Sequence, residues 1–122
     1  MSHLLYSAVV LDDESKKNLI CSFILPYKWQ PVAHHMTIAF KEPVPDHLRN
    51  DIGKTVQLTV KEIGFSKDAM AVKVSGYYSK NKIPHITLAI PDGGKPFNSN
   101  FITKWMPCSK RILTGKVKEI YS

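Results

Sequence analysis

One hexapeptide occurs twice in this sequence, and the repeat constrains the fold more than any other feature. The two copies are His35–Phe40 (HMTIAF) and His85–Ile90 (HITLAI), in which three positions are identical and the other three are apolar in both. Both copies have the length and the apolar content of a buried or half-buried strand. The sequence therefore predicts two equivalent strands in one fold.

Because successive side chains of a strand point to opposite faces, each copy predicts one polar and one apolar face. The polar faces carry His35, Thr37 and Ala39 in the first copy and His85, Thr87 and Ala89 in the second. The apolar faces carry Met36, Ile38 and Phe40, and Ile86, Leu88 and Ile90. One such strand is an ordinary half-buried strand, but chance is a poor account of the same polar face in two strands.

Two such strands, paired about a local two-fold axis, would aim two imidazoles and two hydroxyls at one gap the size of an anion. The unperturbed pKa of histidine is close to neutrality, so one imidazole can act as a general base and the other as a general acid. The threonine hydroxyls can donate hydrogen bonds to a phosphate. The sequence thus predicts His35, Thr37, His85 and Thr87 as catalytic residues that need no metal ion.

The rest of the chain predicts further strands and helices. Strands are predicted at Leu4–Leu11, at residues 55–64 and 69–76 with a hairpin turn between them, and at Ile112–Tyr121. A first helix is predicted after Asp12 or Asp13, with an apolar stripe of Leu19, Ile20, Phe23 and Ile24. A short helix is predicted at residues 43–50, with Asp46 as the cap. A third is predicted from Ser99, with an apolar stripe of Phe101, Ile102, Trp105 and Met106. This order lacks the regular rhythm of a doubly wound sheet, so an α+β fold with largely antiparallel sheets is expected.

Length and composition bound the class of protein. The 122 residues predict a single domain, residues 1–122, that can bury a core without disulfide staples. No apolar run approaches the ~18 residues that cross a bilayer, and the first residues do not resemble a signal peptide. Cys21 and Cys108 lie in stretches with helical periodicity and lack C-x-x-C spacing, so both are expected to be reduced, buried or half-buried thiols of a cytoplasmic protein. The formal charge of +7 indicates an anionic partner.

Other residues that could carry chemistry have weaker patterns. Lys95 follows two glycines in the loop after the second hexapeptide, where it could reach a phosphate, although the run lacks the spacing of a P-loop. His34 precedes His35, and strand alternation predicts that it points to the opposite face, away from the catalytic groups. No Cys and His residues cluster at metal-ligand spacing, so no metal or other cofactor is expected.

The duplicated His-x-Thr-φ pattern, in which φ is apolar, resembles the 2H phosphoesterase superfamily. Its members fold as two similar α+β lobes around a cleft, with one motif on each lobe. They include enzymes that open 2′,3′-cyclic phosphates at RNA ends and enzymes that degrade 2′-linked or cyclic oligonucleotides. The resemblance covers nearly the whole chain and implies a compact bilobal fold with helices flanking largely antiparallel sheets around a central cleft. The fifty residues between His35 and His85 are few for the superfamily and indicate a trimmed member.

Within the superfamily, the chain is most similar to phage nucleases that destroy the cyclic nucleotide messengers of bacterial CBASS immunity. The similar parts are the tyrosine of the first predicted strand, the runs around both motifs, and the GGKP run of residues 93–96 with Ser99, Asn100 and Trp105. In that group a first-strand tyrosine and a late glutamate assist the histidines. Their matches here are Tyr6 and, more roughly, Glu119.

The resemblance implies a metal-independent phosphodiesterase that cleaves 3′–5′ linkages of cyclic di- or trinucleotide signals by two-histidine catalysis, in the host cytoplasm if the protein is viral. Tyr6, Lys95 and Glu119 are the candidate substrate-binding residues. Two alternatives stay open: a 2′,3′-cyclic phosphodiesterase that processes RNA ends, and a nucleotide-binding module that sequesters its ligand without turnover. No membrane association and no stable protein partner are expected.

Overall fold

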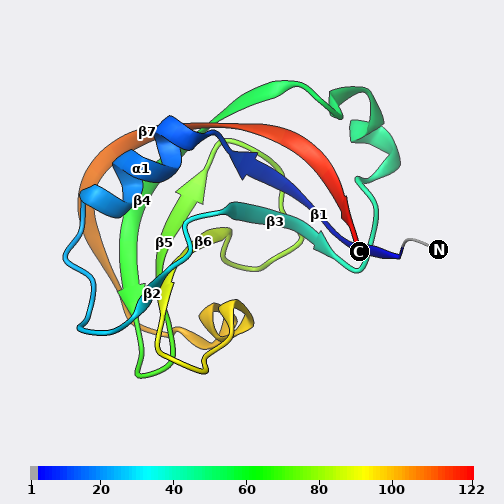
Figure 1. The fold of residues 1–122 in the computed structure, drawn as a ribbon. Coiled ribbons are helices and arrows are strands. Elements are labelled where there is room, and N and C mark those ends of the chain that lie inside the picture. Colours follow the sequence, from blue (N-terminus) through cyan, green and yellow to red (C-terminus); the bar gives the residue numbers. More distant parts are fainter. Residues whose placement is uncertain (1–2) are drawn as a thin grey trace.

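The structure is a computed structural model that describes residues 3–122 (Figure 1). Its strands are β1 (Leu4–Leu11), β2 (Gln30–Pro31), β3 (His35–Phe40), β4 (Thr55–Phe65), β5 (Met70–Ser75), β6 (His85–Ile90) and β7 (Trp105–Tyr121). One α-helix, α1 (Asp13–Cys21), and two short 3₁₀ helices, η1 (Asp46–Asp51) and η2 (Pro96–Phe101), complete the described elements. The expected α+β class is confirmed, and both repeated hexapeptides form strands with the predicted bounds.

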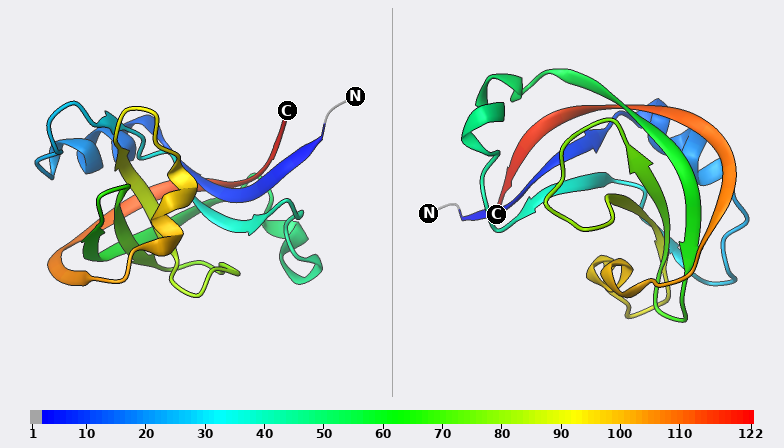
Figure 2. Two further views of the ribbon diagram at one scale, coloured as in Figure 1. Left: turned by 90° about the horizontal axis from the view of Figure 1, so that it is seen from below. Right: turned by 180° about the vertical axis from the view of Figure 1, so that it is seen from behind.

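Every strand pair is antiparallel, and six of the strands close into a ring. Around the ring the order is β6, β3, β1, β7, β4 and β5, and β5 pairs again with β6. The two-residue β2 adds to β6. The views in Figure 2 show how the long strands β4 and β7 curve together around one side of the ring. This closed sheet confirms the expected antiparallel arrangement.

The main hydrophobic core takes buried side chains from all six strands of the ring. Among them are Val9, Ile38, Leu58, Val72, Leu88 and Leu113. Helix α1 packs against β7 and adds the buried Leu19 to this core. At the same contact the hydroxyl of Ser15 accepts a hydrogen bond from the Thr114 N–H (2.8 Å). The core thus supports both hexapeptide strands from their apolar sides.

The first predicted helix is present but shorter than expected. Asp12 caps α1, because its carboxylate accepts a hydrogen bond from the Ser15 N–H (2.7 Å). The helix ends at Cys21, and the connection that follows brings Phe23 to the core while it leaves Ile24 95% exposed. Cys21 is therefore exposed, which corrects the expectation of a buried or half-buried thiol. Within the described residues, no helix is long and apolar enough to cross a membrane.

The helix predicted from Ser99 is wrong: η2 and the beginning of β7 occupy that stretch. Trp105 pairs with Gly64 of β4, where a side chain on the glycine would lie 2.6 Å from Trp105 Cε3. The indole thus packs into the space that glycine leaves, and pairing across the sheet outweighs the local helical spacing. Pro107 also disfavours a helix interior. Cys108 accordingly lies on a strand, as a half-buried free thiol.

Each repeated hexapeptide contains a β-bulge directly after its threonine. In β3, Thr37 and Ala39 pair with consecutive residues of β1, which leaves Ile38 without a partner. The same irregularity in the β5–β6 pairing leaves Leu88 of β6 without a partner. A bulge inserts one residue into a strand and reverses the alternation of the side chains beyond it. The two motifs therefore share a backbone irregularity as well as their residues.

The bulges correct the predicted faces of both hexapeptides. Ala39 and Ala89, expected on the polar faces, are buried in the core. Phe40, expected on the apolar face, lies instead on the side of His35 and Thr37 and lines the same cavity. The alternation rule holds only as far as the bulge in each strand. An aromatic side chain is thereby added to the face that carries the histidine.

Candidate active site

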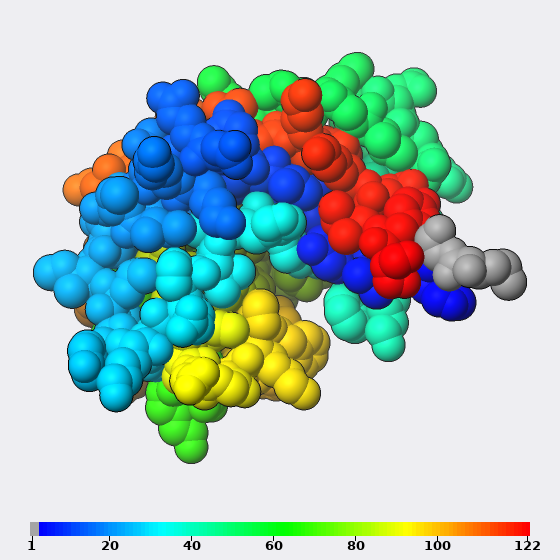
Figure 3. Space-filling model, in the orientation of Figure 1, coloured from blue at the N-terminus to red at the C-terminus, as the bar shows by residue number. Residues whose placement is uncertain are grey.

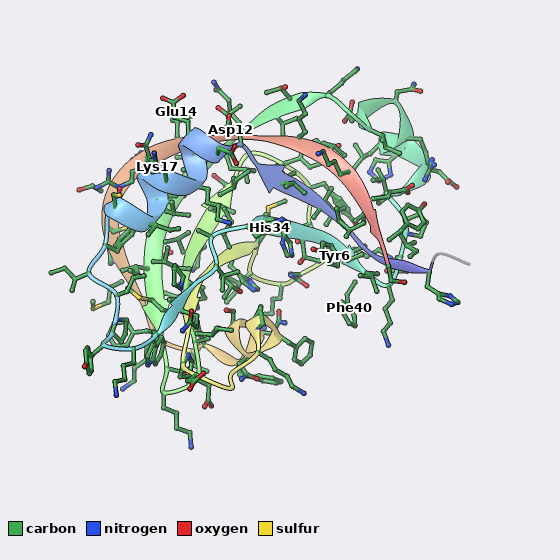
Figure 4. The ribbon with its side chains drawn as sticks, viewed as in Figure 1. Tyr6, Asp12, Glu14, Lys17, His34 and Phe40 are labelled. Atoms are coloured by element: carbon green, nitrogen blue, oxygen red, sulfur yellow. The ribbon has the colours of Figure 1, made fainter. Side chains whose placement is uncertain are left out.

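The four residues of the two His-x-Thr motifs line one cavity of about 400 Å³. The side chains that complete its wall are those of Tyr6, Val32, Phe40, Asn81, Pro96, Phe97 and Asn100. The surface is hollowed between η2 and the end of β3 (Figure 3). Figure 4 shows Tyr6 on β1 and Phe40 at the end of β3, next to this hollow. The structure therefore brings together all four predicted catalytic residues and Tyr6.

A single antiparallel pairing brings the two motifs together. Met36 of β3 pairs with Ile86 of β6, and both side chains are fully buried in the core. The neighbours of these two residues point to the opposite face. Because the strands run in opposite directions, each histidine lies next to the threonine of the other motif. This is the local two-fold arrangement that the repeat predicts.

His85 is held by the backbone just before its own strand. Its Nδ1 lies 2.7 Å from the Ile83 carbonyl oxygen, which can only accept, so Nδ1 carries a proton and donates it. The other ring nitrogen, Nε2, remains free for the cavity. Burial lowers the pKa of His85, and the bond to Ile83 opposes this shift because it stabilises the charged ring.

His35 has two ring neighbours. The Tyr6 ring stacks on the His35 ring with a centroid distance of 4.5 Å and an interplanar angle of 17°. His35 Nδ1 lies 2.9 Å from Nδ1 of His34. Burial, followed by the charges of His34 and His85, lowers the pKa of His35 to about 4. His35 is therefore neutral at pH 7, with Nε2 as the ring nitrogen left for the cavity.

The two threonine hydroxyls have different surroundings. Thr87 Oγ1 lies 2.8 Å from the buried Ser99 hydroxyl and donates to the Pro96 carbonyl at 3.1 Å. Within residues 3–122, no protein hydrogen bond is found for the Thr37 hydroxyl, whose backbone carbonyl accepts from Ser79 Oγ (2.7 Å). Thr37 can thus donate directly to an anion in the cavity, whereas Thr87 must give up a bond to η2.

Lys95 and Glu119, two of the three candidate substrate-binding residues, do not line the cavity. Lys95 is exposed and precedes η2. Glu119 accepts hydrogen bonds from the Val44 N–H (2.9 Å) and from Arg49 Nη1 (2.7 Å). Burial opposes ionisation of Glu119, but these bonds outweigh it and hold the pKa of its carboxyl below the usual value. Glu119 thus ties β7 to η1 and to the segment before it.

Six residues of the cavity wall were not predicted as site residues from the sequence: Val32, Phe40, Asn81, Pro96, Phe97 and Asn100. Phe40 is brought in by the bulge. Asn81 comes from the loop before the second motif, and Pro96, Phe97 and Asn100 come from η2, which follows that motif. The Phe40 and Phe97 ring centroids are 6.1 Å apart, and both rings are more than half exposed. The sequence signal that could have indicated Asn81 and the η2 residues is their closeness to His85 in the chain. The wall of the cavity is therefore aromatic and amide-bearing, with no lysine or arginine among its described residues.

The histidines do not belong to a metal-ligand cluster: no group of three or more His, Cys, Asp or Glu that could hold an ion occurs within residues 3–122. The two imidazoles, two hydroxyls and one phenol instead form a set that can move protons and bind an anion. No model of a known protein family matches the chain. No curated protein matches it either.

Proposed function

We propose that the protein is a metal-independent phosphodiesterase of the 2H type that cleaves ribonucleotide phosphodiesters. The observation that carries the proposal is the convergence of His35, Thr37, His85 and Thr87 on one cavity of about 400 Å³. Two imidazoles on opposite sides of a bound phosphate supply a base and an acid, and hydroxyls bind its non-bridging oxygens.

The different surroundings of the two histidines support different roles. His35 is the general base, because it is neutral at pH 7, and its Nε2 takes the proton of the ribose 2′-OH. The O2′ then forms a bond to phosphorus while the P–O5′ bond breaks. His85 is the general acid: burial lowers its pKa, but the bond from its Nδ1–H to the Ile83 carbonyl opposes this shift and favours the protonated ring, which gives its Nε2 proton to O5′. The products are a 2′,3′-cyclic phosphate and a free 5′-OH.

The proposal includes a two-lobed 2H arrangement within the closed sheet. β3 with β1 would form the centre of one lobe, and β6 with β5 the centre of the other. Three features support this division: the repeated motif, the antiparallel contact of β3 with β6, and the bulge that follows the threonine in each strand. A duplication of one strand pair would produce all three.

The wall of the cavity favours a substrate that carries nucleobases. Phe40 and Phe97 offer exposed aromatic faces, on which any base can stack, and Asn81 and Asn100 offer amide groups to base edges. Because no lysine or arginine occurs among the described residues of the cavity wall, the phosphate would be bound by the motif residues themselves. The leading substrate is a cyclic di- or trinucleotide signal, whose removal would counter CBASS immunity. A 2′,3′-cyclic phosphodiesterase that processes RNA ends is the second candidate, because it would use the same four residues.

The test is a panel of cyclic di- and trinucleotides and 2′,3′-cyclic mononucleotides, incubated with the protein in excess EDTA, with products separated by chromatography. We expect cleavage in EDTA. His35→Asn and His85→Asn should each lose roughly 10²–10⁴-fold in rate, the usual contribution of general acid–base catalysis. Asparagine places an amide near the position of Nδ1 but has nothing in place of Nε2. His47→Asn is the matched control, because His47 is exposed and does not line the cavity.

The nucleophile has a separate test. Substrates with a 2′-deoxy or 2′-O-methyl ribose at the cleaved linkage should bind but resist cleavage, because the attached 2′-OH avoids the entropy of a bimolecular attack. Equal rates for ribo and deoxy linkages would contradict attack by the 2′-OH. Cleavage that EDTA abolishes and zinc restores would contradict the metal-independent mechanism. Tight binding without any turnover would favour a sequestering module instead.

A further inference from the structure

His34 and His35 are neighbours in the sequence whose ring nitrogens meet. Consecutive side chains of a regular strand point to opposite faces, so a distance of 2.9 Å between their Nδ1 atoms requires an irregular backbone. The preceding residue provides it: Ala33 is fully buried with φ +44°, and its N–H donates to the Thr87 carbonyl (2.8 Å). The His34 carbonyl in turn accepts from the Leu11 N–H (3.0 Å). His34 is thus held at the bend before β3.

The Nδ1–Nδ1 contact holds only one hydrogen. Two Nδ1–H groups would clash head to head, and two lone pairs would repel each other. If His34 donates, neutral His35 must carry its proton on Nε2 and cannot accept one from the cavity. If His34 accepts, His35 carries the Nδ1 proton and directs the Nε2 lone pair toward the cavity. Only this second state allows His35 to act as a base at Nε2. It also persists after proton transfer, because the imidazolium form of His35 keeps its Nδ1–H.

The surroundings keep His34 neutral and able to accept. Lys16 of α1 and Lys118 of β7 face it, and burial together with these two charges lowers the pKa of His34. His35 is faced by His34, by Tyr6 of β1 and by His85 of β6. Figure 4 shows His34 at the beginning of β3, beside β1. Burial and the two lysine charges therefore both disfavour a positive charge on the His34 ring, next to His35.

We infer that His34 is a positioning residue that accepts the Nδ1 proton of His35 and so turns the Nε2 lone pair of His35 into the cavity. The contact between the rings is independent of any activity, and its consequence for catalysis rests on the proposed function. This corrects the expectation from strand alternation: His34 does not line the cavity, but it contacts the residue that does.

Long-range ¹H–¹⁵N spectra of the histidine rings test the contact without a substrate. In the wild-type protein, His35 should be in the Nδ1–H form at pH 7. His34→Asn keeps an amide oxygen near the position of Nδ1, so this tautomer should persist. The pKa of His35 should rise in this variant, because asparagine cannot take up the positive charge that His34 acquires at low pH and that disfavours protonation of His35. His34→Phe removes the acceptor as well, so the preference for Nδ1–H should be lost. Lys118→Gln should raise the pKa of His34 and leave the tautomer of His35 unchanged.

Kinetics then test the consequence. With a substrate from the panel, His34→Phe should lower kcat roughly 10–100-fold, the scale seen when a group that orients a functional histidine is lost. His34→Asn should restore most of this rate and shift the acidic limb of the pH profile upward. If the tautomer and pKa of His35 are unchanged in both variants, the inference is overturned, whatever the activity. If the spectra change as expected but no panel substrate is cleaved, the contact stands and the proposed function fails.

Discussion

Thr37 and Thr87 occupy the same position in the two motifs, but their hydroxyls differ in their hydrogen-bond partners. Thr87 Oγ1 is tied to Ser99, which is 1% exposed, and to the Pro96 carbonyl, so it attaches η2 to β6. Thr37 Oγ1 has no such partner within residues 3–122 and is free to donate a hydrogen bond to a group bound in the cavity. The structure therefore predicts that the two positions respond differently to the same substitution.

Thr87→Val should lower the free energy of unfolding by about 1–3 kcal/mol, because it leaves the buried Ser99 hydroxyl without a partner. Thr37→Val should change stability by less than about 1 kcal/mol but lower kcat by up to 10²–10³-fold, the effect of losing one oxyanion donor. Urea denaturation and rate measurements separate the two effects. The double variant Thr87→Val/Ser99→Ala should recover part of the lost stability, and failure to do so would refute the Thr87–Ser99 bond.

The low pKa of His35 predicts a pH-dependent stability. The pKa falls from 6.5 in the unfolded chain to about 4 in the folded protein, so between these values the unfolded state binds more protons. The free energy of unfolding should therefore fall as the pH is lowered from 6.5 to 4, by roughly 3 kcal/mol for a shift of this size. The pKa values of His34 and His85 are also lowered, chiefly by burial, and add in the same direction.

Urea denaturation at pH 7, 5.5 and 4 measures this dependence. His35→Asn should show a flatter profile, because the substituted side chain does not titrate. The difference between the two profiles isolates His35 from the carboxyl groups that titrate in the same range. Parallel profiles for the wild-type protein and this variant would show that His35 is not desolvated in the folded state.

At the scale of elements, β7 decides the shape of the sheet. This strand of seventeen residues pairs with β4 along most of its length and with β1 from Gly115 onward. The two partners overlap at Gly115 and Lys116. A side chain on Gly115 would lie 2.7 Å from the Val10 carbonyl oxygen. Glycine thus permits the close approach of β1, the strand that carries Tyr6 toward His35.

Gly115→Ala should lower the free energy of unfolding by roughly 1–3 kcal/mol, because the methyl group meets backbone that cannot move aside. The matched control is Lys116→Ala, the exposed next residue of the same strand, which should change it by less than about 0.5 kcal/mol. Thermal and urea denaturation check both values. Equal stability of the two variants would show that β1 and β7 are not in close contact at Gly115.

At the scale of the molecule, the first and last described strands lie side by side. Leu4 pairs with Tyr121, and the Ser122 N–H donates to the His3 carbonyl at 2.9 Å, as the adjacent ends in Figure 1 show. The turn of residues 66–68 connects β4 and β5 on the surface, and it does not line the cavity. Exposed turns of this kind tolerate new chain ends.

A circular permutant that joins the two ends by a short Gly/Ser linker and opens the chain at Lys67 should therefore fold. We expect its melting temperature within about 5 °C of the wild-type value, roughly 1–2 kcal/mol for a domain of this size, with unchanged ring resonances of His35 and His85. A permutant opened at Gly93 should melt lower, because the cut frees η2 from Thr87. If the first permutant does not fold, connectivity through Lys67 is essential and the sheet is not as self-contained as its closed pairing implies.

The sequence by itself determined the two motif strands and the presence of one shared site. A hexapeptide with period-two alternation is a local signal, and its repetition pointed to His35, Thr37, His85 and Thr87, which the structure does bring together. The strand Leu4–Leu11 and the hairpin of β4 and β5 were predictable for the same reason. Each depends on residues that are close in the chain.

Only the tertiary structure decided what surrounds these four residues. The bulge that turns Phe40 into the cavity arises from pairing with β1, and the indole of Trp105 joins a strand because Gly64 on β4 leaves room for it. The His34 ring contacts the His35 ring because the backbone bends at Ala33, whose N–H donates a hydrogen bond to the carbonyl of the distant Thr87. These features depend on contacts between residues far apart in the sequence, and local periodicity contains no information about such contacts.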